Sequence, residues 1–416
     1  MITQTTKLSN RLGPGVITGA ADDDPSGIAT YSQAGAQFGT GMLWTLVFTT
    51  PLMIGIQMVS ARVGWVTGRG LAANICRIAP RWLAIGLVAL LVLANTLNIG
   101  ADIAAMADAM QLVVGGSSQP YVVLFGVLCA ALPVWLSYAA MVRVLKWFTL
   151  ALLAYVGVVL ALHVNWERVL VQTLVPQLLS GSNYWMMIVG VLGTTISPYL
   201  FFWQASQEAE DHQHIHMVDK AQSTQEHLSV IKLDTIIGMV FSNVIAFCVM
   251  LATAITLNQN GITNIETAKQ AAEALRPIAG DFAFTLFALG IIGTGMLAVP
   301  VLAGSAAYAV ADVFEWRSGL DRKLSKAKGF YGVLIAATAV GTLIDFSALD
   351  PIKALVWSAV VNGVVAVPIM WMMMRIGTSR EILGAYTLSR RHQILGWFAT
   401  LVMFAAVCAM VYSWFG

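Results

Sequence analysis

The sequence has few charged residues, since Asp, Glu, Lys and Arg together make up 11% of its 416 residues. A soluble protein carries about 25% charged residues, so this composition excludes an ordinary soluble domain. Four cysteines are scattered, mostly inside apolar runs, and their spacing does not match a metal site. No phosphate-binding glycine loop, zinc signature or nucleophile motif occurs. We therefore expect neither an enzyme nor a resident cofactor.

Apolar residues dominate what is present. Hydrophobic residues make up 58% of the chain and the mean hydropathy is +0.76, which predicts an all-α integral membrane protein forming one transmembrane domain over residues 1–416. Each apolar span is near the ~20 residues that a helix needs to cross a bilayer. The eleven expected spans are 13–39, 42–66, 82–113, 120–141, 145–164, 184–206, 229–257, 281–312, 329–346, 351–375 and 393–415.

The basic residues predict the orientation of these spans. Cytoplasmic loops of membrane proteins carry an excess of Lys and Arg. With the N-terminus in the cytoplasm, 19 of the 23 Lys and Arg residues fall on the cytoplasmic side. The exceptions are Arg168, Lys269, Arg276 and Lys353. We expect a cytoplasmic N-terminus and an external C-terminus, and we expect the basic loop 317–328 to attract anionic lipid.

The first span contains three consecutive carboxylates followed by a proline. Because proline removes a backbone donor and disfavours helix at the residue before it, the helix should break at Asp24-Pro25. Unwound backbone at membrane depth is tolerated where it lines a cavity or is buried in protein. An acidic, broken membrane helix therefore predicts a cation site. The stretch reads Ala21-Asp22-Asp23-Asp24-Pro25-Ser26-Gly27.

The sixth span is interrupted in a similar way by Ser197-Pro198, which follows the small polar run at 193–195. Two interrupted helices separated by five spans are typical of a transporter with two inverted five-helix repeats. The repeats would cover residues 13–164 and 184–375, and the helix at 393–415 would be an addition. The alternative is that Pro198 only kinks its helix.

Asp24 is the best candidate for the residue that binds the ion, since a buried carboxylate is costly unless it is paired or metal-bound. Other oxygen-bearing ligand candidates are Gly27, Thr194, Ser197 and Asn362. Oxygen ligands suit hard cations such as Mg²⁺, which keeps several waters, whereas a thioether favours softer metals. Ser26, Asn98, Asp102 and Tyr199 are candidates for a supporting role.

Some side chains leave alternatives open. Three roles are open for Asp22 and Asp23. They would form an acidic vestibule, make water-mediated contacts, or cap the downstream half-helix. Asn95, Asn98 and Asp102 share one helix face, where they either join helices or line the cavity. We expect Asp108 and Asp312 to be solvated. An expected polar loop contains His212, His214 and His216. Histidines two apart do not share a helix face, so a polar loop is favoured over a regulatory metal site.

Five segments resemble the NRAMP metal transporters. They are Gly-Pro-Gly at 13–15, Asp-Pro-Ser-Gly-Ile-Ala-Thr at 24–30, Gln-Ala-Gly-Ala-Gln-Phe-Gly at 33–39, Leu-Trp at 43–44 and Ala-Arg-Val-Gly-Trp-Val-Thr-Gly at 61–68. The resemblance covers nearly the whole membrane region. It implies a LeuT-type fold with broken helices 1 and 6, divalent metal transport and alternating access.

The chain departs from the family motifs at informative positions. The family's Asp-Pro-Gly-Asn reads Asp-Pro-Ser-Gly at 24–27, and its Met-Pro-His reads Ser-Pro-Tyr at 197–199. Acidic family positions associated with the proton route fall on Asn95 and Asn98. The thioether and the histidine tied to proton movement are therefore absent. These changes resemble the NRAMP-related magnesium transporters, a branch that takes Mg²⁺ and Mn²⁺ without proton coupling.

The resulting hypothesis is a carrier in a prokaryotic plasma membrane that imports Mg²⁺, and also Mn²⁺, without proton coupling. The alternative is an ordinary proton-coupled Mn²⁺/Fe²⁺ transporter. Rivals of other kinds are an amino-acid symporter of the same fold and a metal sensor that does not transport. Beyond the metal ion and membrane lipid, we expect no nucleic-acid partner and no obligatory protein partner.

Overall fold

The computed structural model describes residues 13–135, 150–178, 181–218, 224–320, 322–346 and 350–415, and within these ranges it contains helices and no β-strand. The all-α prediction is confirmed. The helices are α1 (Pro14–Asp22), α2 (Pro25–Phe38), α3 (Leu43–Thr67), α4 (Leu71–Ile78), α5 (Arg81–Val114), α6 (Gln119–Trp135), α8 (Leu153–Ala161), α9 (Trp166–Leu174), α10 (Ser182–Thr195), α11 (Pro198–Val218), α12 (Thr224–Thr256), α13 (Ala268–Glu273), α14 (Arg276–Ala279), α15 (Ala283–Phe314), α16 (Lys328–Ile344), α17 (Pro351–Thr378), α18 (Arg380–Leu383) and α19 (Arg390–Phe415).

By length and composition, seven helices in the described ranges can cross a membrane, or eight if the bent pair Leu150–Ala161 and Trp166–Leu174 forms one span. Helical segments also occupy the other predicted ranges as far as they are described. Residues 136–141 of the fourth predicted span and 145–149 of the fifth lie outside the described residues. The total of eleven spans therefore stays a prediction.

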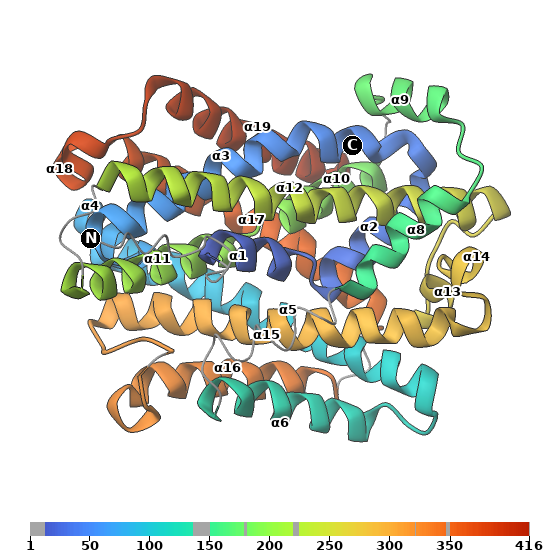
Figure 1. Cartoon of the computed structure of the whole chain (residues 1–416), viewed down its shortest axis with the longest axis horizontal. Coiled ribbons are helices and arrows are strands. Elements are labelled where there is room, and N and C mark those ends of the chain that lie inside the picture. The colour runs from blue at the N-terminus through green and yellow to red at the C-terminus, as the bar shows by residue number, and fades with distance from the viewer. Residues whose placement is uncertain are drawn as a thin grey trace, which may run out of the picture.

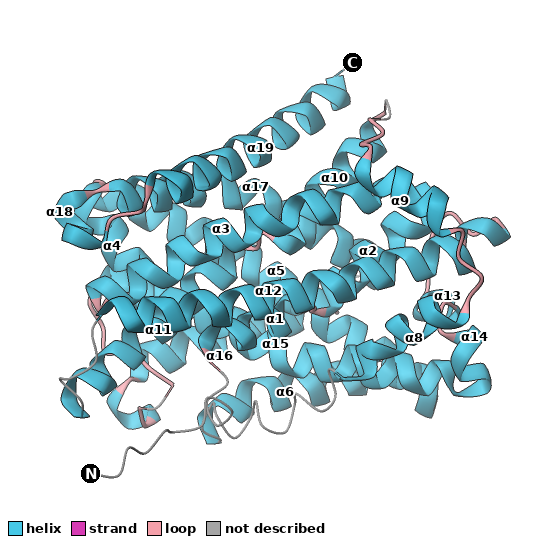
Figure 2. Ribbon diagram, turned by 45° about the horizontal axis from the view of Figure 1, so that its top comes forward, coloured by secondary structure: helices cyan, strands magenta, loops and turns pink. Residues whose placement is uncertain are grey.

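The short helices mark two ends of the helix bundle (Figures 1 and 2). Helices α4 and α18 lie at one end, and α9, α13 and α14 lie at the other. The four basic residues predicted to be external belong to α9, α13, α14 and the first turn of α17. Which end faces the cytoplasm stays a prediction. Of the nineteen residues on the other side, Lys7, Arg11, Arg143, Lys146 and Lys220 lie outside the described residues.

The half-helix α1 lies in the middle of the bundle and packs lengthwise on α12 (Figure 1). A Cβ on Gly19 would overlap the Gly238 backbone of α12, and a Cβ on Gly238 would overlap the backbone of Gly15 and Val16. Small residues let membrane helices approach in this way. At the start of α1, the backbone N–H of Gly15 donates to the Asp234 carboxylate on α12 at 2.7 Å. The first half-helix is therefore fixed to α12 through its backbone.

Helix α11 is longer than the sequence pattern predicts. The expected sixth span ends at residue 206, but α11 continues to Val218, so the prediction of a polar loop was wrong. After Pro198 this stretch has no glycine or proline, and Gln, Glu and Ala are good helix formers. His212 lies on this helix with its ring edge against Trp65, at 5.2 Å between ring centres. The side chains of His214 and His216 lie outside the described residues.

Candidate metal site

The first break lies where the proline predicts it. Helix α1 ends at Asp22 and α2 begins at Pro25. Asp24 is the N-cap of α2, with an extended backbone (φ −69°, ψ 169°). Pro25 occupies the first helical position, where its missing N–H costs no hydrogen bond. The predicted break at Asp24-Pro25 is confirmed.

The Asp24 carboxylate is buried, with 2% of the residue exposed, and three donors hold it. Its Oδ1 accepts from the Gly27 N–H at 2.7 Å and from the Ser26 hydroxyl at 2.8 Å. Its Oδ2 accepts from the Asn98 amide at 2.9 Å. A carboxylate offers about four lone-pair sites, so these three hydrogen bonds orient Asp24 and still leave an oxygen lone pair for a cation.

Gly27 gives the Asp24 carboxylate room at the N-terminus of α2. A Cβ at this position would lie 3.2 Å from the Asp22 carbonyl oxygen and 3.3 Å from the Asp24 Oδ1. Both distances are tighter than ordinary contacts. A side chain at this position would require the Asp24 carboxylate to shift by about a few tenths of an ångström from the N-terminus of α2, where the helix dipole favours a negative charge.

Asp22 and Asp23 turn away from the N-terminus of α2. The Ser242 hydroxyl on α12 lies 2.8 Å from the Asp22 Oδ2 and 3.1 Å from the Asp23 Oδ1. The expectation that these residues cap the downstream half-helix was wrong. Asp24 is the N-cap of α2, its backbone is extended, and its own side chain accepts the Gly27 N–H. Their other predicted roles stay predictions.

The polar face of α5 serves two different purposes. Asn95 donates to the Leu302 carbonyl oxygen and the Ser305 hydroxyl of α15, at 2.8 and 2.7 Å. Its amide therefore joins helices. Asn98, one turn further, donates to Asp24 and accepts from the Ser358 hydroxyl of α17 at 2.6 Å. The next turn carries Asp102, which is fully buried and has no hydrogen-bond partner for either carboxylate oxygen among the described residues.

The second break is complete rather than a kink, because α10 ends at Thr195 and α11 begins at Pro198. Its hydroxyls donate to their own helix. Thr194 donates to the Val191 carbonyl oxygen at 3.0 Å, and Ser197 is placed 2.8 Å from the Gly193 carbonyl oxygen and 2.7 Å from that of Thr194. The hydroxyl oxygens keep lone pairs for a cation. As metal ligands, Thr194 and Ser197 stay predictions.

Tyr199 connects the two breaks. Its hydroxyl donates to the Ala21 carbonyl oxygen in the last turn of α1, at 3.0 Å. The side chain is buried, and it replaces the histidine of the family motif at this position. The structure therefore brings the second broken helix against the first through a phenol that is neutral at physiological pH.

Asn362 on α17 is completely buried, and neither its amide oxygen nor its nitrogen has a hydrogen-bond partner among the described residues. It lies one turn beyond Ser358, which holds Asn98, and residues four apart share a helix face. The structure therefore places Asn362 on the face of α17 that carries the Asn98 contact. Its role as a metal ligand stays a prediction.

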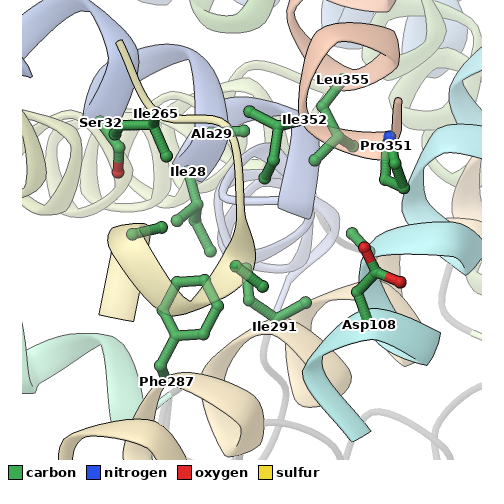
Figure 3. A pocket seen from close by; sticks show the side chains of 13 residues that line it. Ile28, Ala29, Ser32, Asp108, Ile265, Phe287, Ile291, Pro351, Ile352 and Leu355 are labelled. Atoms are coloured by element: carbon green, nitrogen blue, oxygen red, sulfur yellow. The ribbon is translucent and has the colours of Figure 1, made fainter. Parts of the chain in front are cut away.

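A small cavity of about 20 Å³ begins at Ile28, one turn from Asp24 (Figure 3). Its volume is enough for about one water. The walls are mostly apolar and come from α2, α5, α13, α15 and α17, and Asp108 of α5 also lines it. Asp108 is half-buried, since α17 and α13 cover part of that turn of α5, so the expectation of a solvated Asp108 holds only in part.

Asp312 was also expected to be solvated, and this expectation was wrong. It is half-buried and accepts a hydrogen bond from the Ala73 N–H in the first turn of α4, at 3.2 Å. A carboxylate at a helix N-terminus satisfies donors that have no partner within the helix.

In the part of the chain that the structure describes, no three His, Cys, Asp or Glu side chains gather in a way that could hold a metal. The groups that contact the Asp24 carboxylate are all neutral donors.

A family model described as natural resistance-associated macrophage protein-like matches residues 15–413. The chain belongs to the Nramp family. Among curated relatives, the divalent metal cation transporter MntH of Caldanaerobacter subterraneus is 25% identical over 375 residues, which cover 85% of this chain and 81% of the relative. The MntH of Klebsiella pneumoniae is 25% identical, covering 93% of this chain and 90% of the relative.

Solved structures agree on the fold of this Nramp chain. The manganese transporter of Eremococcus coleocola, solved with an aromatic bis-isothiourea substituted compound, superposes with a TM-score of 0.72 at 17% identity, over 97% of this chain and 87% of that one. MhsT, solved with L-phenylalanine, gives 0.64 at 11% identity, over 97% and 99%. The predicted LeuT-type fold is confirmed.

Sequence reasoning missed two serines that hold site residues of this Nramp chain. Ser242 contacts Asp22 and Asp23, and Ser358 contacts Asn98. Ser242 stands next to Asn243 in the apolar run of α12, and this polar pair is a signal that the sequence does contain. Ser358 is a single serine in an apolar helix, where serines commonly bond to their own backbone, so only the packing reveals its role.

Proposed function

We propose that this Nramp-family chain imports Mg²⁺, and also Mn²⁺, across a bacterial plasma membrane by alternating access and without proton coupling. One observation carries the proposal. The donors that orient Asp24 are a hydroxyl, a backbone amide and a side-chain amide, and serine and tyrosine stand where the family motif has methionine and histidine. The soft ligand and the titratable imidazole are both replaced by oxygen-bearing side chains.

The chemistry of Mg²⁺ fits these residues. Mg²⁺ prefers oxygen ligands and gives up its waters reluctantly, so it is held by one or two carboxylates together with several retained waters. Asp24 supplies a carboxylate, and Thr194, Ser197 and Asn362 supply neutral oxygens around it. Without a thioether, the site has no group that selects for softer transition metals. We therefore assign the chain to the magnesium-transporting branch of the family.

The membrane potential makes proton coupling unnecessary for import. Moving two positive charges through a potential of about 100 mV, negative inside, yields about 4.6 kcal/mol. This energy corresponds to roughly a thousandfold accumulation of the ion. The named functions of the relatives, divalent metal and manganese transport, support a divalent cation as the substrate.

The test is uptake into proteoliposomes that contain the purified full-length protein, an internal Mg²⁺-sensitive dye and a pH-sensitive dye. An imposed negative internal potential should drive Mg²⁺ entry without a matching proton flux, and external Mn²⁺ should compete. Asp24→Ala should reduce uptake to the level of empty vesicles, because it removes the carboxylate at the break. Asp281→Ala, at an exposed residue, is the matched control and should transport as the wild type does.

Other outcomes would replace the proposal. Internal acidification that follows Mn²⁺ entry, with no response to millimolar Mg²⁺, would favour the proton-coupled Mn²⁺/Fe²⁺ transporter. Undiminished Mg²⁺ uptake by Asp24→Ala would contradict the assignment of the site. Saturable cation binding with no flux under any potential would point to a sensor.

A further inference from the structure

Helix α19 lies on the outside of the bundle, where it runs from α18 to the C-terminus (Figure 2). One side of this helix packs on α17, α10 and α3. In its most apolar 18-residue stretch only 33% of the residues are buried, against 56–89% in the other six described helices that can cross a membrane. Most of α19 is therefore open to the surrounding lipid.

A groove of about 470 Å³ follows the outer face of α19. Residues three or four apart on a helix lie on the same face, and the residues that line the groove follow this spacing. They are Arg390, Gln393, Ile394, Trp397, Phe398 and Leu401. Their backbone spans about 16 Å along the helix axis. This length is about half of the ~30 Å hydrocarbon core, so the groove matches one leaflet of the bilayer.

The lining changes from charged to apolar along the groove. Arg390 is exposed at the first position of α19, and the polar Gln393 follows one turn later. The next turns present large apolar side chains to the outside, and the exposed fractions are 63% for Ile394, 54% for Phe398 and 61% for Leu401. A phospholipid has the same order of groups, since a charged head precedes its acyl chains.

The charge at the start of the groove is positive and uncompensated. Helix α19 begins with Arg390 and Arg391, and neither side chain forms an ion pair or a hydrogen bond among the described residues. Arg62, by contrast, donates to the carbonyl oxygens of Tyr386 and Thr387, just before α19. The N-terminus of a helix is the positive end of its dipole, which disfavours basic side chains and attracts anions. A bound anion would offset both sources of positive charge.

We propose that this groove binds one anionic phospholipid, with its phosphate at Arg390 and the N-terminus of α19 and its chains along Ile394, Phe398 and Leu401. Charge complementarity favours this occupant over a neutral lipid, because anionic lipid attracts Lys and Arg at the membrane surface. The predicted orientation places this end of α19 on the cytoplasmic side, where the leaflet surface is negatively charged. The lipid site does not depend on which ion the chain carries.

The test is binding of phosphatidylglycerol to the delipidated full-length protein in detergent, measured by native mass spectrometry, with phosphatidylcholine of the same chains as the neutral comparison. The wild type should bind one phosphatidylglycerol about tenfold more tightly than phosphatidylcholine. Arg390→Gln should weaken phosphatidylglycerol binding about fivefold and leave phosphatidylcholine binding unchanged. Arg380→Gln, at an exposed residue of α18 outside the groove, is the matched control and should bind as the wild type does.

A pair of phenylalanines on α19 tests the apolar part of the groove. Phe398→Ala should weaken phosphatidylglycerol binding about threefold to tenfold, because it removes apolar surface that the chains would cover. Phe404 is exposed to a similar extent, 52% against 54%, but it does not line the groove. Phe404→Ala should therefore leave binding unchanged. Each variant must elute as a single species and keep a cooperative thermal transition.

Three results would overturn the proposal. Equal weakening by Arg380→Gln and Arg390→Gln, or equal binding of the two lipids, would show a general surface attraction without a site. Displacement of the lipid by millimolar inorganic phosphate, with no effect of Phe398→Ala, would leave a site for a free anion only. A wild-type dimer that Phe398→Ala converts to a monomer, with lipid binding unchanged, would make this face an interface between two copies of the chain.

Discussion

The two helix breaks satisfy their polar groups in opposite ways. At the first break, Asp24 draws donors from its own half-helix and from α5, so that its charge is held by groups from several elements. At the second break there is no charge, and the Thr194 and Ser197 hydroxyls donate to carbonyl oxygens of α10. The same proline-induced interruption thus produces a fixed anion in one helix and a neutral oxygen surface in the other.

This difference suggests a division of roles between the breaks. Under the proposed function, the buried Asp24 carboxylate attracts the cation to the first break, since an intramembrane charge is costly unless it is paired. Under the same proposal, the oxygen ligands of the second break select the cation, because ligand softness separates Mg²⁺ from transition metals. Changes at the first break should therefore alter affinity for all divalent ions, and changes at the second should alter selectivity.

The largest effect is expected from the helix that supports the first break. Asn98→Leu removes the donor to the Asp24 Oδ2 and should cost about 1.5–3 kcal/mol, or roughly tenfold to a hundredfold in Mg²⁺ uptake at low concentration. Asn95→Leu, one turn away, is the matched control. It breaks contacts to α15 and should lower the melting temperature while leaving uptake within about twofold. Equal losses of uptake in both variants would contradict the division of the α5 face.

The second break should respond to a change of ligand softness. Ser197→Met restores the thioether of the family motif, so competition by Cd²⁺ against Mg²⁺ uptake should strengthen by about tenfold, and Mg²⁺ uptake itself should fall. Ser197→Ala removes the hydroxyl without adding sulfur and should leave the ratio of Cd²⁺ to Mg²⁺ affinity nearly unchanged. An unchanged ratio in Ser197→Met would place the ion away from the second break.

The smallest effect is expected where the breaks touch. Tyr199→Phe removes the hydrogen bond to the Ala21 carbonyl oxygen, and a neutral hydrogen bond contributes about 0.5–1.5 kcal/mol. Hydrogen–deuterium exchange in the last turn of α1 should therefore rise a few-fold, with uptake changed less. Tyr155→Phe is the control, since that buried hydroxyl has no hydrogen-bond partner among the described residues. Exchange that rises equally in both variants would show that the contact does not restrain α1.

The sequence predicts the breaks better than the contacts around them. Pro25 and Pro198 act through their own backbone, so local rules place both interruptions correctly. The Asn95 and Asn98 amides share one helix face, and only the packing of α15 and α17 shows that they serve different purposes. The polar stretch of α11 was mistaken for a loop because its composition resembles one, although its residues favour helix. The partners Ser242 and Ser358 are distant in sequence and depend on how whole helices meet.

The contact between α1 and α12 also bears on how easily the first half-helix can move. A Cβ on Gly19 or on Gly238 would overlap the backbone of the other helix, so α1 and α12 meet backbone to backbone. Its hydrogen bonds to α12 lie at its two ends, at Gly15 and at the Asp22–Asp23 pair. Helix α1 is about 14 Å long, and it is hydrogen-bonded to α12 at both of its ends. Loss of either end contact would therefore free one end of the half-helix beside the break while the other end stays bound to α12.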